Sequence, residues 1–193
     1  MFVSQFDGSD PVAAVRARCR LDEEYVRDRI GGLISNGLAD SDTALSELGR
    51  SSLRVVLAGG VFDIIHPGHI HTLRAARNLG DVLVVVVATS GTAKKMKKRM
   101  PLHSQDQRRD LVGALSTVDL CLVGEEGDIF RTVERVRPEV IALGYDQIHQ
   151  EKFITDGCRR IGLDVKVARL QSPVPEISSS RIEQEYGDSI HGI

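Results

Sequence analysis

Residues 59–69 read GGVFDIIHPGH and follow Val55 to Ala58, an apolar run with the length of a buried strand. Residues 70–77, which come next, have helical character. The two glycines allow the backbone to turn tightly. Pro67 suits the first turn of a helix, because its missing N–H would be unpaired there in any case. The stretch therefore predicts a strand, a glycine turn and the N-terminus of a helix.

Two histidines, His66 and His69, lie at the start of this predicted helix. They are three residues apart, so both side chains project from nearly the same side of the first turn. A helix N-terminus also has unpaired N–H groups and a partial positive charge, and both favour phosphate. The turn is therefore a candidate phosphate-binding site that both imidazoles can reach.

The chain after residue 50 alternates short apolar runs with helical patterns. The apolar runs cover residues 53–58, 82–88, 118–123, 140–143 and 165–170, and the helical patterns cover 69–79, 105–115, 129–136 and 151–161. This alternation predicts an α/β fold, a Rossmann-like doubly wound parallel sheet of five strands with helices on both faces. Ligands of such sheets bind beyond the carboxyl ends of the strands, where residues 59–69 would lie.

Residues 1–50 differ in charge from the rest of the chain. They contain six Lys and Arg against nine Asp and Glu, whereas residues 51–193 contain nineteen against eighteen. We predict a helix over 11–18 and another over 21–38, with Asp22 as the N-cap of the second. The apolar stripe of the second helix consists of Tyr25, Val26, Ile30, Leu33 and Ile34. Residues 38–50 resemble the end of a winged helix-turn-helix module, so we divide the chain into a small helical, winged-helix-like domain (1–50) and a second domain (51–193).

The overall composition argues against several classes of partner. The 193 residues have a formal net charge of -2, which disfavours a nucleic-acid coat or a polybasic membrane binder. No apolar run approaches the roughly 18–20 residues that cross a bilayer, and residues 1–7 lack the layout of a signal peptide. The three cysteines, Cys19, Cys121 and Cys158, form no CxxC or Cys/His cluster, which argues against structural zinc and disulfides. We predict a cytoplasmic protein without a membrane partner.

The winged-helix-like segment leaves one alternative of another class, a DNA-binding regulator whose second domain senses a nucleotide. Its candidate recognition helix carries four acidic residues, Asp22, Glu23, Glu24 and Asp28, against Arg27 and Arg29. DNA-binding helices normally present a basic face. We therefore expect residues 1–50 to pack on the second domain or on another copy of the chain, as in a homodimer, and not to bind DNA.

The GGVFDIIHPGH stretch resembles the HxGH nucleotidylyltransferases, a superfamily that includes the cytidylyltransferases and the archaeal FAD synthases. These enzymes join an NMP from an NTP to a phosphate-bearing acceptor and release pyrophosphate. The resemblance implies that His66 and His69 are catalytic and contact the triphosphate, which Mg2+ bridges. It implies nucleotide binding by Gly59, Gly60, Val61, Phe62 and Gly68. Asp63 would position the acceptor or the metal, or cap the turn.

Two basic stretches follow the second predicted strand. Residues 94–99 hold five cations in six positions. The resemblance gives Lys94 a catalytic role and Lys95 a role toward the acceptor, and it leaves open which of Lys94, Lys95 and Lys97 faces the site. The alternative is a solvated basic loop. Arg108, in the helix start at 105–109, aligns with an arginine that binds the acceptor phosphate in the family, as its planar fork suits. It could also be an exposed helix residue.

Two more stretches complete the resemblance. Residues 143–147 place Gly144 and Asp146 at the nucleotide. Tyr145, assigned to the acceptor, and Phe153 could stack on a base or on another flat ring, with a plain turn as the alternative. Residues 177–182 resemble a serine-rich motif that begins the last helix of these enzymes. The residues predicted there are Ile177, Ser178, Ser179 and Ser180 for nucleotide binding and Arg181 for catalysis. The alternative is a capping box formed by Ser180 and Glu183.

The same resemblance ranks the substrates. Residues 87–109 and 143–147 look most like archaeal FAD synthases, which adenylylate FMN. Residues 177–180 are closer to glycerol-3-phosphate cytidylyltransferases, but a tryptophan common in those enzymes is absent. We therefore predict ATP and FMN first, and CTP with a polyol or alcohol phosphate second. The second pKa of an acceptor phosphate is about 6, so the reaction needs no general base.

Overall fold

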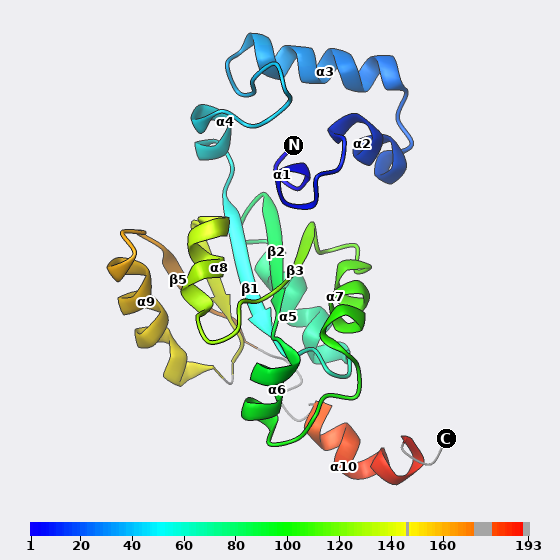
Figure 1. Ribbon diagram of the computed structural model, residues 1–193, viewed down its shortest axis with the longest axis vertical. Coiled ribbons are helices and arrows are strands. Elements are labelled where there is room, and N and C mark those ends of the chain that lie inside the picture. Colours follow the sequence, from blue (N-terminus) through cyan, green and yellow to red (C-terminus); the bar gives the residue numbers. More distant parts are fainter. Residues whose placement is uncertain (146, 172–178, 191–193) are drawn as a thin grey trace. The chain divides into compact units, whose positions relative to one another are not determined.

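The computed structural model describes residues 1–145, 147–171 and 179–190, and the chain divides into two compact units, Met1–Leu53 and Arg54–Ile193 (Figure 1). This division lies close to the predicted boundary after residue 50. The first unit is helical, as predicted, and its winged-helix character stays a prediction. Its helices are α1 (Ser4–Asp7), α2 (Pro11–Cys19), α3 (Glu23–Ser35) and α4 (Glu47–Ser51).

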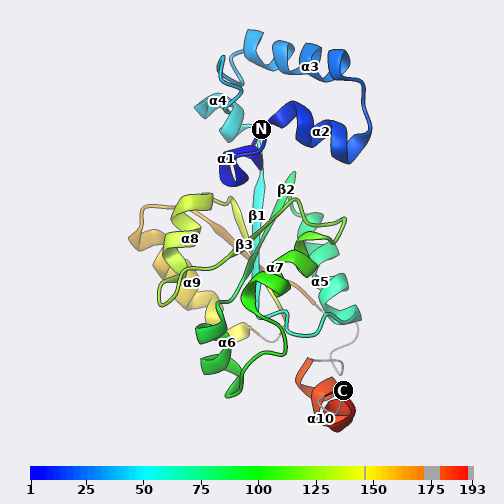
Figure 2. The same cartoon turned by 45° about the vertical axis from the view of Figure 1, so that its right-hand side comes forward.

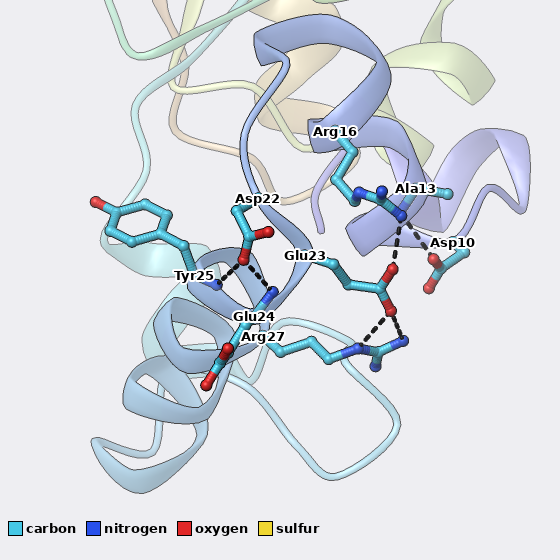
Figure 3. A network of polar contacts seen from close by, with 8 residues as sticks. All are labelled: Asp10, Ala13, Arg16, Asp22, Glu23, Glu24, Tyr25 and Arg27. Atoms are coloured by element: carbon cyan, nitrogen blue, oxygen red, sulfur yellow. Dashed lines mark hydrogen bonds and ion pairs between the residues drawn. The ribbon is translucent and has the colours of Figure 1, made fainter.

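Acidic N-caps and an ion-pair chain organise α2 and α3 (Figure 3). Asp10 accepts a hydrogen bond from the N–H of Ala13 at the start of α2, and Asp22 caps α3, as predicted. Glu23 pairs with Arg16 of α2 at 2.6 Å and with Arg27 one turn further along α3 at 2.8 Å. These contacts join the two helices on their polar sides.

An apolar cluster joins the same helices on their other sides. Val12 of α2 packs with Val26 and Ile30 of α3, and Ile34 is half-buried against them. The predicted stripe therefore forms the contact between the two helices, but Tyr25 is exposed.

The second unit contains a five-stranded sheet in which every neighbouring pair of strands is parallel. The strand order is β3-β2-β1-β4-β5. The strands are β1 (Val55–Gly60), β2 (Val82–Val87), β3 (Leu120–Val123), β4 (Val140–Leu143) and β5 (Lys166–Arg169). The predicted doubly wound parallel sheet is confirmed, and its strand order reverses between β1 and β4.

Helices cover both faces of this sheet (Figures 1 and 2). The second unit contains α5 (Pro67–Arg77), α6 (Ser90–Lys97), α7 (Gln105–Gly113), α8 (Ile129–Val136), the 3-10 helix η1 (Ile148–Gln150), α9 (Glu151–Arg160) and α10 (Ser179–Ile190). The pair α5 and α7 lies on one face, and the pair α8 and α9 lies on the other. This arrangement follows from right-handed crossovers in a sheet whose strand order reverses once.

Alternation along the strands sends successive side chains to opposite faces. Ala58 of β1 and Ala142 of β4 belong to the cluster that packs against Leu73 of α5 and Val112 of α7. Leu57, the residue before Ala58 on β1, faces the side of α8 and α9. Because both faces are buried, the strands are continuous apolar runs, as seen in β2. None of the helices in the described part of the chain is long and apolar enough to cross a membrane.

Candidate active site

A cavity of about 170 Å³ opens at the carboxyl end of β1, on the face of the sheet that α5 covers. It lies where the strand order reverses, which is the usual ligand position in such sheets. The cavity brings together residues that are far apart in the sequence. Its described lining includes Gly59, Gly60, Val61, Phe62, His66, Gly68, His69, Thr72, Met96, Lys97, Gly144, Tyr145, Gln147 and Ser179.

The turn after β1 has a strained centre. Phe62 has φ = 51°, in the left-handed region that residues with a side chain rarely adopt. Its ring is buried and its centroid lies 5.1 Å from that of His69. A Cβ atom on Gly60 would lie 2.9 Å from the Phe62 ring, so glycine is required there by close approach. The Phe62 ring therefore packs the turn against the His69 ring.

His66 and His69 stand side by side at the start of α5. His66 is the N-cap residue with an extended backbone, and its side chain does not cap the helix. The two ring centroids are 3.9 Å apart. The Nδ1 atoms of both rings are buried and have no hydrogen-bond partner among the described residues. Buried polar atoms are normally paired, so this pair is suited to a ligand that supplies the partner.

Burial sets the charge of this pair. It lowers the pKa of His69 to about 4, with smaller contributions from His66 and Lys97. Burial and Lys97 also lower the pKa of His66 below its usual value. Both imidazoles are therefore neutral near pH 7 before a ligand binds. A bound polyphosphate would favour the imidazolium form, because an opposite charge nearby raises the pKa of histidine.

Lys97, rather than Lys94 or Lys95, is the lysine that lines the cavity. The segment 90–97 forms helix α6, so residues three or four apart share a face. Ala93 is buried and Lys97 lies one turn beyond it, whereas Lys94 and Lys95 are exposed on the other side. Of the three lysines, Lys97 is the one placed at the cavity, and the roles of Lys94 and Lys95 stay predictions.

The start of α10 closes the cavity from another side. Ser179 is buried, and its hydroxyl donates to the carbonyl oxygen of Ile64 in the turn after β1 at 2.9 Å. The ammonium of Lys97 donates to Oγ of Ser180 at 3.3 Å. Arg181 is exposed in the first turn of the helix. The predicted site residues Ile177 and Ser178 lie outside the described residues.

The segment after β4 contributes the remaining wall. Gly144 and Tyr145 line the cavity, and the N–H of Gly144 donates to Oε1 of Gln147 at 2.8 Å. Asp146, predicted to bind the nucleotide, lies outside the described residues. Phe153 packs against Phe130 of α8, with ring centroids 5.2 Å apart. Tyr145 is therefore the aromatic residue of this segment that the structure brings to the cavity.

Asp63 is almost completely buried, and its Oδ2, although ion-paired, has no hydrogen-bond partner among the described residues. Its Oδ1 accepts from the N–H of Leu102 at 2.7 Å, and its Oδ2 pairs with Nη1 of Arg99 at 2.8 Å. These contacts tie the turn after β1 to residues 99–102, which follow Lys97. The Asp63 carboxylate thus fixes this loop, and its contact with the acceptor or the metal stays a prediction.

Arg108 is also a framework residue rather than an exposed helix residue. It is 0% exposed, and its guanidinium donates to the carbonyl oxygens of Val61 (2.7 Å), Ala88 (2.9 Å) and His103 (3.1 Å). Burial lowers the pKa of Arg108, and the nearby Asp63 carboxylate opposes that shift. Its Nη2 atom has no partner among the described residues. The predicted contact with an acceptor phosphate could therefore come from Nη2 alone.

The cavity and its residues can be compared with known proteins. The model of a family described as cytidylyltransferase-like matches residues 57–185. The chain belongs to the cytidylyltransferase-like family. The matched segment includes the turn after β1, Lys97, Arg108 and the start of α10, so family membership and the cavity concern the same residues.

Relatives within this family match this chain over most of their own length. The chain is 51% identical to the FAD synthase of Aciduliprofundum boonei over 69% of its own length and 80% of the relative. It is 46% identical to the FAD synthase of Picrophilus torridus, over 65% of the chain and 89% of the relative. A crystal structure titled as a lipopolysaccharide core biosynthesis protein from Thermoplasma volcanium is 41% identical, covers 62% of this chain and 98% of its own, and has a TM-score of 0.59. The prediction that the chain is a nucleotidylyltransferase is confirmed.

Proposed function

We propose that this cytidylyltransferase-like protein is an FAD synthase that transfers AMP from ATP to FMN and releases pyrophosphate. The observation that carries the proposal is the 42–51% identity to several archaeal FAD synthases across the segment that builds the cavity. The walls of the cavity fit the chemistry, because imidazoles, an ammonium, hydroxyls and a helix N-terminus are all groups that bind phosphate.

The proposed reaction exchanges one phosphorus–oxygen bond for another. An oxygen of the FMN phosphate attacks the α-phosphorus of ATP and forms the new bond. The bond from the α-phosphorus to the bridging oxygen breaks, and pyrophosphate leaves with that electron pair. The attacking oxygen is already ionised near pH 7, so the protein has no proton to remove. Its task is to hold the two anions in line and to stabilise the charge that develops at the α-phosphate.

Each residue of the cavity has a place in this proposal. His66 and His69, which both line the cavity, bind the triphosphate and stabilise the transition state through their imidazole rings. Lys97 neutralises the triphosphate, and Arg181 adds positive charge at the start of α10. Gly144 and Tyr145 line the part of the cavity that would hold a nucleobase.

The divalent cation is proposed to arrive with the triphosphate. The described residues include no group of three or more His, Cys, Asp or Glu that could hold a metal ion. Asp63, the acidic residue beside the histidines, is already paired with Arg99 and with a backbone N–H. Mg2+ commonly binds through substrate phosphates and water, and it would neutralise phosphate charge here.

A matrix of substrates tests the proposed function. Purified protein is incubated with Mg2+ and each of ATP, CTP, GTP and UTP, paired with FMN, glycerol 3-phosphate, phosphoethanolamine or phosphopantetheine. Pyrophosphate release is measured, and the product is identified by absorbance and mass. We expect FAD from ATP and FMN. A product from CTP and a polyol phosphate only would refute FAD synthase and leave the nucleotidylyltransferase class intact.

The lysines of α6 offer a matched comparison. Replacement of Lys97 with methionine should lower kcat/KM for ATP by about 10–100-fold, because it removes a cation from the triphosphate site. The same replacement at Lys94 or Lys95, which are exposed on the other side of α6, should change kcat/KM by less than about twofold. Steady-state rates of FAD formation at varied ATP measure the difference. A larger loss at Lys94 than at Lys97 would reverse this assignment.

We also propose that the protein is a cytoplasmic homodimer in which the first unit takes part. The described cysteines are free, and burial raises the pKa of the Cys121 thiol to about 12, as suits an inert thiol in a reduced protein.

The acidic first unit disfavours binding to nucleic acid. Light scattering should give the mass of two chains, and a monomeric mass would contradict the dimer.

A further inference from the structure

A second cavity, of about 190 Å³, lies on the opposite face of the sheet from the histidines. Leu57 of β1 and Ile141 of β4 line it and not the first cavity, whereas Ala142, the neighbour of Ile141, lines the first cavity and not this one. Val133 of α8 and Ile154 of α9 close the second cavity from outside the sheet. The alternation of side chains along the strands therefore separates two cavities with different walls.

The two cavities meet at the end of β1. Both cavities are lined by Ala58, Gly59, Gly60, Met96 of α6 and Gln147. A ligand that occupies the second cavity can therefore extend past the glycines to the side where His66 and His69 lie. Two ligands that must react with one another fit this arrangement, with their rings on opposite faces of the sheet and their phosphates together at its edge.

The mouth of the second cavity is apolar and exposed. Ile129, the first residue of α8, is 43% exposed, and Met96 is 53% exposed. Both side chains line this cavity. Water-exposed apolar residues at the rim of an apolar cavity are suited to a ligand that covers them. Gln147 and Gln150 add amides, Glu125 adds a carboxylate, and Thr89, Thr92 and Thr132 add hydroxyls to a lining that is otherwise apolar.

We propose that this second cavity binds the isoalloxazine ring of the flavin substrate, with Ile129 as a residue that determines acceptor specificity. This inference rests on the proposed function. Of the two ring systems in that reaction, the flavin ring has the larger apolar surface and an apolar dimethyl edge, which match aliphatic walls. Its polar edge carries N–H and carbonyl groups that an amide such as that of Gln150 can pair with. A polyol phosphate has no ring to fill the cavity.

The test uses neutral substitutions, so that electrostatic attraction to phosphate does not change. Ile129→Asn should raise the KM for FMN about tenfold and the KM for ATP less than twofold, because it removes apolar contact from the flavin ring alone. Ile129→Leu keeps an apolar side chain and should stay within about twofold of the wild type. Leu111→Asn is the control, because Leu111 is 45% exposed on α7 and lines neither cavity.

A binding measurement separates the ring from the phosphate. Riboflavin carries the same ring without phosphate, and quenching of its fluorescence should report weaker binding to the Ile129→Asn protein by a similar factor. A rise in the KM for ATP with no change for FMN would overturn the inference and assign the cavity to adenine. Unchanged riboflavin binding would overturn it as well. The proposed function fails separately, if the wild-type protein forms no FAD from ATP and FMN.

Discussion

Replacement of His66 or His69 with alanine is expected to lower kcat for FAD formation by about 10²–10⁴-fold, with little change in thermal midpoint. The two ring centroids lie 3.9 Å apart with the rings tilted by 35°, and the Nδ1 atoms have no partner among the described residues. A side chain that is poised for a ligand and makes no hydrogen bond in the folded protein contributes to turnover more than to folding. Turnover at saturating substrates and thermal unfolding should be measured on the same preparations.

A third histidine provides the matched control. His71 lies on the same helix, is exposed, and does not line the cavity that holds the other two rings. His71→Ala should therefore keep kcat within about twofold of the wild type. If His66→Ala and His69→Ala both kept near-wild-type turnover, the assignment of the cavity as the active site would be wrong.

The sequence predicts the sheet and the histidine pair well because both depend on neighbours in the chain. Strands buried on both faces must be continuously apolar, so their number and parallel direction follow from short apolar runs between helices. His66 and His69 are related by a single helical turn, which fixes their common direction. The choice among Lys94, Lys95 and Lys97 could not be made in this way, because the helix over 90–97 and the burial of Ala93 are known only from the structure.

The roles of Asp63 and Arg108 could not be predicted in this way. Charged residues in a sequence are normally expected at the surface, because an unpaired charge in the interior is unfavourable. Whether such a residue is buried depends on partners that only the fold supplies. Arg99 comes from the loop after α6, and the carbonyl of Val61 reaches Arg108 across a separation of 47 residues. Asp63 and Arg108 therefore resemble ligand-binding residues in sequence but are framework residues in the structure.

Arg108→Met is expected to destabilise the protein by about 3–5 kcal/mol, and so to lower the thermal midpoint by roughly 10 °C. Methionine can replace the aliphatic part of arginine, but it offers no donor to the carbonyl oxygens of Val61, Ala88 and His103. A buried acceptor that loses its donor keeps the full penalty of its lost hydration. Arg108→Lys should recover little of the lost stability, because one ammonium cannot reproduce the hydrogen-bond geometry of the planar guanidinium.

The neighbouring arginine separates this effect from a general loss of positive charge. Arg109 is half-buried and forms ion pairs with the exposed Asp106 and Asp110, so Arg109→Met should change stability by no more than about 0.5 kcal/mol. Thermal unfolding and urea titration of the two variants give the comparison. An Arg108→Met protein as stable as the wild type would contradict the framework role. A rise in its KM for FMN would then assign the arginine to the acceptor phosphate through Nη2, the nitrogen without a partner in the described part of the chain.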